Sequence, residues 1–397
     1  MMYRLRIWEQ TTGVQLPVGE MVCEINGNGQ GKGAFRYDQE FLERFDTFAV
    51  DPASLPLKNG TFTLNHPGIY GVFEDSLPDD WGRKLLVRKH NIPRHDQNLP
   101  NLLFAISNSG LGALSYTAHE QPLPPPAETS VRNLSALVTA AEMFEHGELR
   151  DPELTMLLGA GSSPGGARPK VVVYYEEADI HYIAKFPSIK DQVDVVKIEC
   201  ATMALAATAG LIVPPTTLVE CGGKPVLLVK RFDVIPGGRR HMISMQTLLK
   251  AEGYYHLRYQ DVLEVVRKYS SNPREDSERL YRQMIFNAII GNTDDHLKNF
   301  WMVYDHQKKW RLSPAFDLVP DIGNRGEHVL FFDIDPFYRG RKSLEIIGRR
   351  WGIANSEIVV EQVFKAVVGW KEEFSRKGVP EADIFRFREI DGNLLKA

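Results

Sequence analysis

Two acids and an amide in the last third of the chain have side chains suited to binding a divalent cation. Asn299 ends the polar segment 292–299, Asp317 follows further along, and Asp294 lies five positions before Asn299. Carboxylate and amide oxygens are ligands for hard cations such as Mg²⁺. If these side chains meet, we expect Asn299 and Asp317 to share a metal ion.

A short hairpin is expected to bring these residues together. Apolar residues at helical spacing predict a helix over residues 280–290, which Gly291 can end in the left-handed conformation. The polar run 292–299 then reads as an exposed loop, followed by strands at 300–304 and 310–312. A hairpin brings its open ends together, so the residues before the first strand and after the second should be close.

The spacing of Asp294 and Asn299 matches that of the base and the metal-binding Asn in the protein-kinase pattern H-R-D-x-x-x-x-N. We therefore assign Asp294 the role of catalytic base. The structural alternative is that Asp294 or Asp295 caps a turn by bonding to nearby backbone.

A loop rich in glycine and small residues, 159–170, precedes an expected strand at 171–175. Backbone N–H groups of such a loop can bind phosphate oxygens, although the segment is not a Walker A motif. A simple linker is the alternative interpretation. The residues expected to contact ATP here are Gly161, Ser162, Ser163, Gly165 and Gly166.

Lys185 lies among apolar residues of a second expected strand, 181–187, where an ammonium needs a partner. A helix expected from about residue 194 to 209 offers Glu199. In kinases such a lysine holds the nucleotide phosphates and the glutamate orients it. The other interpretation is a structural ion pair.

Two further contacts with the nucleotide are expected. The apolar segment 226–233 could act as a hinge against adenine through Val229, Lys230 and Phe232. Lys298, beside Asn299, is either a solvated surface charge or a phosphate ligand.

Together these segments resemble the HipA family of bacterial serine/threonine kinases, many of which are toxins of toxin–antitoxin pairs. The segments that carry the resemblance occur in family order along most of the chain: 73–83, 166–170, 184–187, 231–233, 293–299 and 316–317.

The resemblance implies an α+β, two-lobed protein-kinase-like fold. Its N-terminal lobe would be mixed α/β with a small strand-rich N-terminal subdomain, and its C-terminal lobe mainly α-helical. Asp294 would be the catalytic Asp, Asn299 and Asp317 the Mg²⁺ ligands, and Lys185 the ATP phosphate ligand. The family also implies autophosphorylation of a phosphate-loop serine, which matches Ser163, with Ser162 as the adjacent alternative.

The same resemblance implies partners. These are a protein substrate, which in this family includes aminoacyl-tRNA synthetases, and a small helix-turn-helix antitoxin, with DNA bound only through that complex. Two other functions remain open: a small-molecule phosphotransferase, and mainly a corepressor that binds an antitoxin and operator DNA.

Composition fits a globular protein of more than one unit. The 397 residues are 43% hydrophobic and 25% charged, and a net charge of −4 gives no general attraction to nucleic acid. Three separated cysteines imply no disulfide framework, and the chain shows no signal-peptide layout or membrane-length apolar run, so we expect a cytoplasmic location without membrane contact. The expected units are a HipA-like N-terminal subdomain (1–120), a Pro-rich linker (121–130), the nucleotide-binding part of the kinase core (131–240) and a mainly helical catalytic lobe (241–397).

Three local expectations complete the pattern. Residues 75–78 resemble a helix entrance with a capping Asp75 and an early proline, ahead of a helix near 81–90. The glycine-rich segment 27–33 reads as a hairpin connection rather than a phosphate loop. The last clear helix is expected over about 355–374, with an apolar packing stripe.

Overall fold

A computed structural model describes most of the chain. The described residues are 1–26, 31–65, 68–118, 121–124, 129–148, 156–157, 168–253, 255–323 and 325–396.

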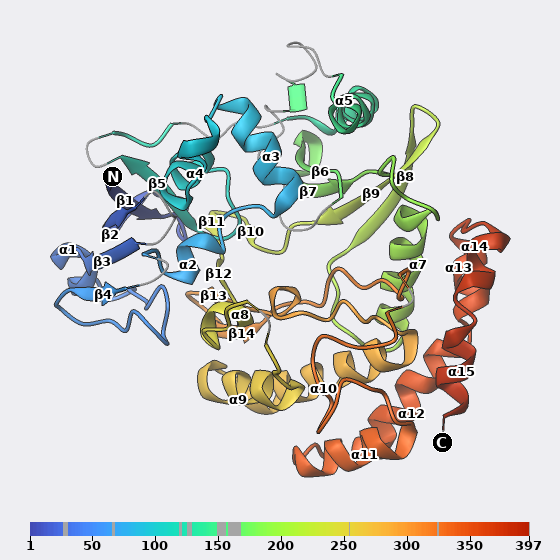
Figure 1. Cartoon of the computed structure of the whole chain (residues 1–397). Coiled ribbons are helices and arrows are strands. Elements are labelled where there is room, and N and C mark those ends of the chain that lie inside the picture. The colour runs from blue at the N-terminus through green and yellow to red at the C-terminus, as the bar shows by residue number, and fades with distance from the viewer. Residues whose placement is uncertain are drawn as a thin grey trace.

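The N-terminal part is built on an antiparallel sheet of five strands in the order β4-β3-β2-β1-β5 (Figure 1). Buried and exposed residues alternate along β1, as expected for a strand that packs one face on a core. The bounds of the strands are β1 Met2–Glu9, β2 Leu16–Ile25, β3 Gly31–Tyr37, β4 Phe62–Leu64 and β5 Leu114–Ala118. The helices that accompany them are α1 Gln39–Glu43, α2 Gly71–Glu74, α3 Asp80–Lys89 and α4 Leu99–Ile106.

A second antiparallel sheet has the order β6-β7-β9-β8 and lies between two helices. Its strands are β6 Lys170–Tyr175, β7 Ile180–Lys185, β8 Thr216–Cys221 and β9 Lys224–Lys230. Val226 and Leu228 pack with α5 (Leu134–His146), whereas Leu227 and Val229 pack with α7 (Val195–Thr208). The alternation along β9 therefore buries both faces of this sheet.

The C-terminal part is mainly helical and carries a third sheet, β12-β13-β14. The hairpin β13 (Trp301–Asp305) and β14 (Lys309–Leu312) matches the expected one, and β12 (His241–Ser244) adds a strand that the sequence did not predict. A two-stranded ribbon, β10 (Val234–Ile235) with β11 (Gly238–Arg239), precedes it. The helices are α8 Met245–Leu248, α9 Tyr259–Tyr269, α10 Pro273–Ile290, α11 Arg341–Arg350, α12 Ser356–Val367, α13 Trp370–Arg376, α14 Glu381–Arg386 and α15 Glu389–Leu395.

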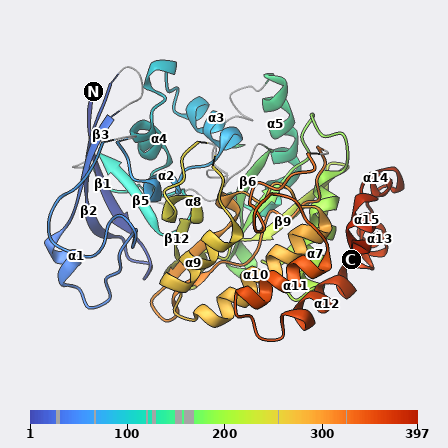
Figure 2. The same ribbon diagram turned by 60° about the horizontal axis from the view of Figure 1, so that its bottom comes forward.

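One continuous apolar core runs from the N-terminal sheet into the C-terminal helices. The N-terminal sheet and helices α13 to α15 lie at opposite sides of the molecule, with the other elements between them (Figure 2). Polar contacts reinforce the junction, because Asp75 accepts hydrogen bonds from the backbone N–H and hydroxyl of Ser244, each over 2.8 Å. The N-terminal part is thus joined to the rest by both packing and hydrogen bonds.

Two local predictions need correction. The expected helix over 355–374 is divided at Gly369 into α12 and α13, and α14 and α15 follow it. The turn at 75–78 does not begin a helix at Asp75, which lies instead at the end of α2; the next helix, α3, begins at Asp80 with Asp79 at its N-cap position. Strands β2 and β3 pair antiparallel, as a hairpin requires, but residues 31–33 of the expected connection belong to β3. Among the helices that the structure describes, none is long and apolar enough to cross a membrane.

Candidate active site

The loop that carries Asp294 begins at the end of α10, where Gly291 has φ +72°. It was expected to be exposed, and that prediction is wrong for most of it. Asp295 is fully buried and accepts hydrogen bonds from the Tyr259 hydroxyl over 2.5 Å and from the Val329 backbone N–H over 2.8 Å. His328 Nδ1 lies 2.9 Å from the same carboxylate.

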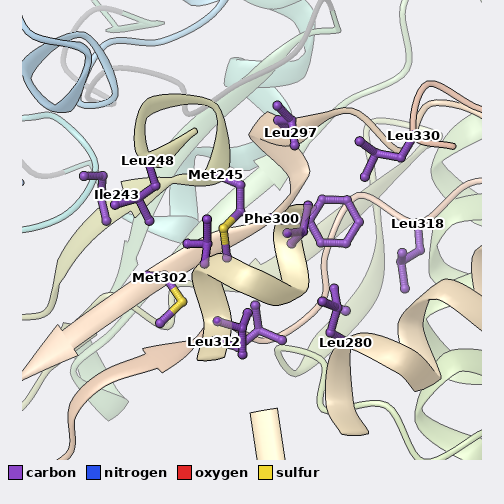
Figure 3. Packing of buried hydrophobic residues seen from close by; sticks show 14 of the residues in the cluster. Ile243, Met245, Leu248, Leu280, Leu297, Phe300, Met302, Leu312, Leu318 and Leu330 are labelled. Carbon is purple, nitrogen blue, oxygen red and sulfur yellow. The ribbon is translucent and has the colours of Figure 1, made fainter. Parts of the chain in front are cut away.

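Apolar side chains hold the other side of this loop. Leu297 and Phe300 are buried among Leu280 of α10, Leu318 and Leu330 (Figure 3). The loop is therefore anchored by a buried acid on one side and by apolar packing on the other. Asp294 is left with a largely exposed side chain.

Asp294, Asn299 and Asp317 all line a single cavity of about 300 Å³. The side-chain amide of Asn299 donates to the backbone carbonyl of Asp294 over 2.8 Å, which fixes both residues in one turn. Asp317 follows the hairpin and has φ +56°, an uncommon conformation for a residue other than glycine. The hairpin thus brings the three predicted residues to one site.

Lys185 reaches from β7 into the same cavity and contacts two carboxylates. Its ammonium donates to Glu199 of α7 and, over 2.8 Å, to Asp317 Oδ1. Burial alone would lower the pKa of Lys185, but Asp317 and Glu199 raise it above its ordinary value. Burial raises the pKa of Glu199, with Lys185 acting in the opposite direction. The pairing expected from the sequence is present, and Asp317 extends it to a triad.

Asp317 is kept as a carboxylate in spite of its surroundings. Burial disfavours the charged form, yet the charges of Lys185 and Lys170 hold the pKa of Asp317 well below its usual range. An ionised carboxylate beside an amide oxygen is a donor set that suits Mg²⁺, which usually takes one or two protein oxygens together with phosphate and water. Within the described ranges no group of three His, Cys, Asp or Glu side chains could hold a metal by itself. The residues present fit a metal that arrives with a nucleotide.

The expected hinge also lines the cavity, through Val229, Lys230 and Phe232. Next to them, Arg231 forms a buried ion pair with Asp233, at 2.6 Å. Asp233 also accepts from the backbone N–H of Gly112, over 2.9 Å, so this segment is tied to the N-terminal part.

Lys298, which the sequence left undecided, is half-buried and lines the cavity. Its ammonium donates to Asp79 of the N-terminal part over 3.4 Å. Of the predicted ATP contacts, Gly161, Ser162, Ser163, Gly165 and Gly166 lie outside the described residues.

Several charged residues of this cavity were not predicted from the sequence, among them Lys170, Asp79 and Arg325. Lys170 is buried opposite Lys185 in the β6–β7 register, and burial followed by the Lys185 charge lowers the pKa of Lys170. The sequence feature that could have indicated Lys170 is its position as the last residue of the glycine-rich segment 159–170. Arg325 lies in a loop without sequence periodicity, so no local pattern indicated it.

Comparison with known proteins decides the family. The family model of the HipA-like C-terminal domain matches residues 162–370, and that of the HipA N-terminal domain matches residues 16–117. The first match alone covers more than half of the chain. This chain belongs to the HipA family.

Relatives of this HipA-family chain are named kinases. It is 27% identical over 385 residues to the putative kinase Y4mE of Sinorhizobium fredii, which covers 88% of this chain and 84% of that protein. It is also 27% identical over 309 residues to the serine/threonine-protein kinase toxin HipA of Shewanella oneidensis, which covers 68% of this chain and 66% of that protein. Such relatives imply the use of ATP, generally with a metal ion.

A solved structure supports the fold of this HipA-family chain. The complex of HipA, HipB and operator DNA from Shewanella oneidensis MR-1 contains a chain that matches with a TM-score of 0.69 at 17% identity, covering 98% of this chain and 96% of that one. The α+β kinase-like fold expected from the sequence is thereby confirmed.

Proposed function

We propose that this protein is an ATP- and Mg²⁺-dependent serine/threonine protein kinase of the HipA toxin type. The observation that carries the proposal is the convergence of Asp294, Asn299, Asp317 and Lys185 on one cavity. Membership of a family with kinase relatives supports the same reaction class.

In the proposed reaction, the side chain of Asp294 orients a serine or threonine hydroxyl and accepts its proton. The hydroxyl oxygen forms a bond to the γ-phosphorus as the bond from that phosphorus to the β,γ-bridging oxygen breaks, with ADP as the leaving group. Lys185, held by Glu199, offsets negative charge on the phosphates. A bound Mg²⁺, held by Asn299 and Asp317, would supply further positive charge to the phosphate oxygens. Catalysis of this kind consists mainly of positioning and electrostatic stabilisation.

The hinge contacts belong to the proposal as well. Val229, Lys230 and Phe232 line the cavity on the side of β9, where adenine would lie against backbone groups. Lys298, which also lines the cavity, would contact the phosphates, and the glycine-rich loop is predicted to do so as well.

The proposal extends to regulation and partners. Ser163 would be autophosphorylated, and about two added negative charges would repel ATP phosphates from that loop and silence the enzyme. The solved relative was crystallised with HipB and operator DNA, which supports a small helix-turn-helix antitoxin as partner here, with DNA contacted through that complex. The substrate would be a cellular protein, with an aminoacyl-tRNA synthetase as a candidate. We retain the division of the chain at residues 120, 130 and 240 as part of this proposal, with a cytoplasmic location.

The central test is Asp294→Asn. We expect labelled phosphate transfer from Mg·ATP to fall by about 10²- to 10⁴-fold, the usual contribution of a positioned base, while the Kd for Mg·ATP stays within about twofold. Equal transfer by the variant would refute the role of Asp294. A wild-type protein that binds no Mg·ATP would refute the proposed function as a whole.

The autophosphorylation proposal has a separate test. After incubation with Mg·ATP, mass spectrometry should find phosphate on Ser163, and Ser163→Ala should remove it. Ser162→Ala is the matched control and should retain it. Phosphate on Ser162 alone would overturn the assignment, and a phosphorylated protein that binds ATP normally would overturn the silencing mechanism.

A further inference from the structure

The side chain of Asp79 does not cap α3 but contacts a residue of the candidate active site. Asp79 stands at the N-cap of α3, where an Asp side chain normally accepts from the backbone N–H two or three residues on. In this structure it makes no such bond, and its carboxylate accepts from Lys298 Nζ over 3.4 Å instead. The two residues are far apart in the sequence, and both line the cavity.

The turn that carries Asp79 is braced from two sides. Arg83 of α3 donates from Nη2 to Glu74 and from Nε to the carbonyl of Pro78, each over 2.8 Å. Two residues earlier on the same helix, Trp81 is buried and packs edge-on against Phe144 of α5, with ring centroids 5.5 Å apart. Asp79 is therefore held in place by both the N-terminal part and the nucleotide-binding part.

We propose that Asp79 is a positioning residue that holds the Lys298 ammonium at the phosphate end of the cavity, beside Asn299. This inference rests on the proposed function and deepens it, because it makes the N-terminal part a component of the active site. A lysine side chain has many rotamers, and holding it in advance reduces the entropy lost when it meets a phosphoryl group.

The negative charge of Asp79 predicts different effects on ATP binding and on the rate of transfer. A carboxylate near the phosphate site repels ATP, so its removal alone should leave ATP binding unchanged or make it tighter. Loss of positioning should at the same time slow phosphoryl transfer. A purely structural role predicts a different result, in which a distorted cavity weakens ATP binding and lowers the stability of the fold.

The test is a double-mutant cycle of Asp79→Asn and Lys298→Met in the full chain. Asn is isosteric with Asp and equally suited to an N-cap, so the fold should persist. Asp80→Asn is the matched control, because Asp80 is the exposed neighbour in the same helix and does not line the cavity. For each variant we would measure Mg·ATP affinity by calorimetry, transfer from γ-labelled ATP, and the unfolding temperature.

We expect Asp79→Asn to slow transfer about fivefold, the scale of losing one partly exposed ion pair. Its Kd for Mg·ATP should not rise, and its Tm should not fall. Lys298→Met should slow transfer about tenfold or more. Adding Asp79→Asn to Lys298→Met should cause no further loss. Cycles of this kind isolate the coupling between two residues.

The inference alone would be overturned if Asp79→Asn transferred phosphate at the wild-type rate, or if it slowed transfer in the Lys298→Met background as much as in the wild type. Weakened ATP binding together with a lowered Tm would overturn it too. Asp80→Asn should behave as wild type; a slowdown equal to that of Asp79→Asn would point to α3 as a whole and also overturn it. Failure of the wild-type protein to bind Mg·ATP would instead refute the proposed function, and this inference with it.

Discussion

Arg325 donates a hydrogen bond from Nη1 to Oδ1 of Asp294 over 2.8 Å, and both side chains are more than half exposed. The guanidinium thus occupies one carboxylate oxygen of the candidate base and leaves the other for an acceptor hydroxyl. The segment is shaped by Asp321, whose carboxylate accepts from the backbone N–H of Gly323 over 2.9 Å.

Arg325→Gln should slow phosphate transfer about fivefold without changing Mg·ATP affinity, because the orientation of Asp294 is lost while the phosphate side of the cavity is intact. The Tm should hardly change, since exposed ion pairs contribute little to stability. Transfer rates and thermal unfolding check this. Arg350→Gln is the matched control, because Arg350 forms a similarly exposed pair with Asp333 over 2.7 Å. A faster Arg325→Gln variant would show that the guanidinium shields the base.

The same substitution at the adjacent residues Asp294 and Asp295 should change the free energy of unfolding by very different amounts. Asp295 is buried and accepts from several donors, so Asp295→Asn leaves some of them facing an amide N–H and should lower the free energy of unfolding by about 2 to 4 kcal/mol. Asp294→Asn should leave that free energy nearly unchanged. Chemical denaturation of both variants measures the difference, and a stable Asp295→Asn protein would contradict the anchoring role.

Asp75 should give stability a specific pH dependence. Burial raises the pKa of Asp75 from 3.8 to about 6, so the folded state binds its proton more readily than the unfolded state. The stability from this group is complete below pH 3.8 and is lost as the pH rises through 6. From pH 7 to pH 5, the wild type should therefore gain about 1 kcal/mol relative to Asp75→Asn.

A second buried group acts in the opposite direction over the same range. Burial lowers the pKa of His241 from 6.5 to about 4, so its contribution is lost as the pH falls. The two effects on the free energy of unfolding therefore largely cancel in the wild type. The contribution of Asp75 is seen only by comparison with Asp75→Asn. Denaturant midpoints at several pH values provide it; a difference that is constant with pH would contradict the shift at Asp75.

Magnesium should stabilise the nucleotide complex through Asp317. With Mg·ATP at about 100 times its Kd, linkage predicts a stabilisation of about 2.7 kcal/mol, seen as a higher Tm. Chelation of magnesium by EDTA, or the substitution Asp317→Asn, should remove most of that increase. The same increase in Asp317→Asn would argue that this side chain does not hold the metal, whereas Arg350→Gln should retain the full effect.

Local sequence patterns determined the elements that surround the site. The periodicity of residues 280–290, the glycine that follows and the strand-forming residues after position 299 predicted α10, its end at Gly291 and the hairpin. The helix that carries Glu199 was predicted in the same way, and the structure places Asp194 at its N-cap. These features depend on neighbours a few residues apart, which the sequence displays directly.

The tertiary structure decided the burial and the partners of several polar residues at the site. It buried Asp295 and exposed Asp294, although the two are adjacent and chemically identical. It also directs the Asp79 carboxylate to Lys298 and not to the N-cap bond of α3, and it brings Arg325 into contact with Asp294. Such choices depend on contacts between distant segments, and local propensity carries no information about those contacts.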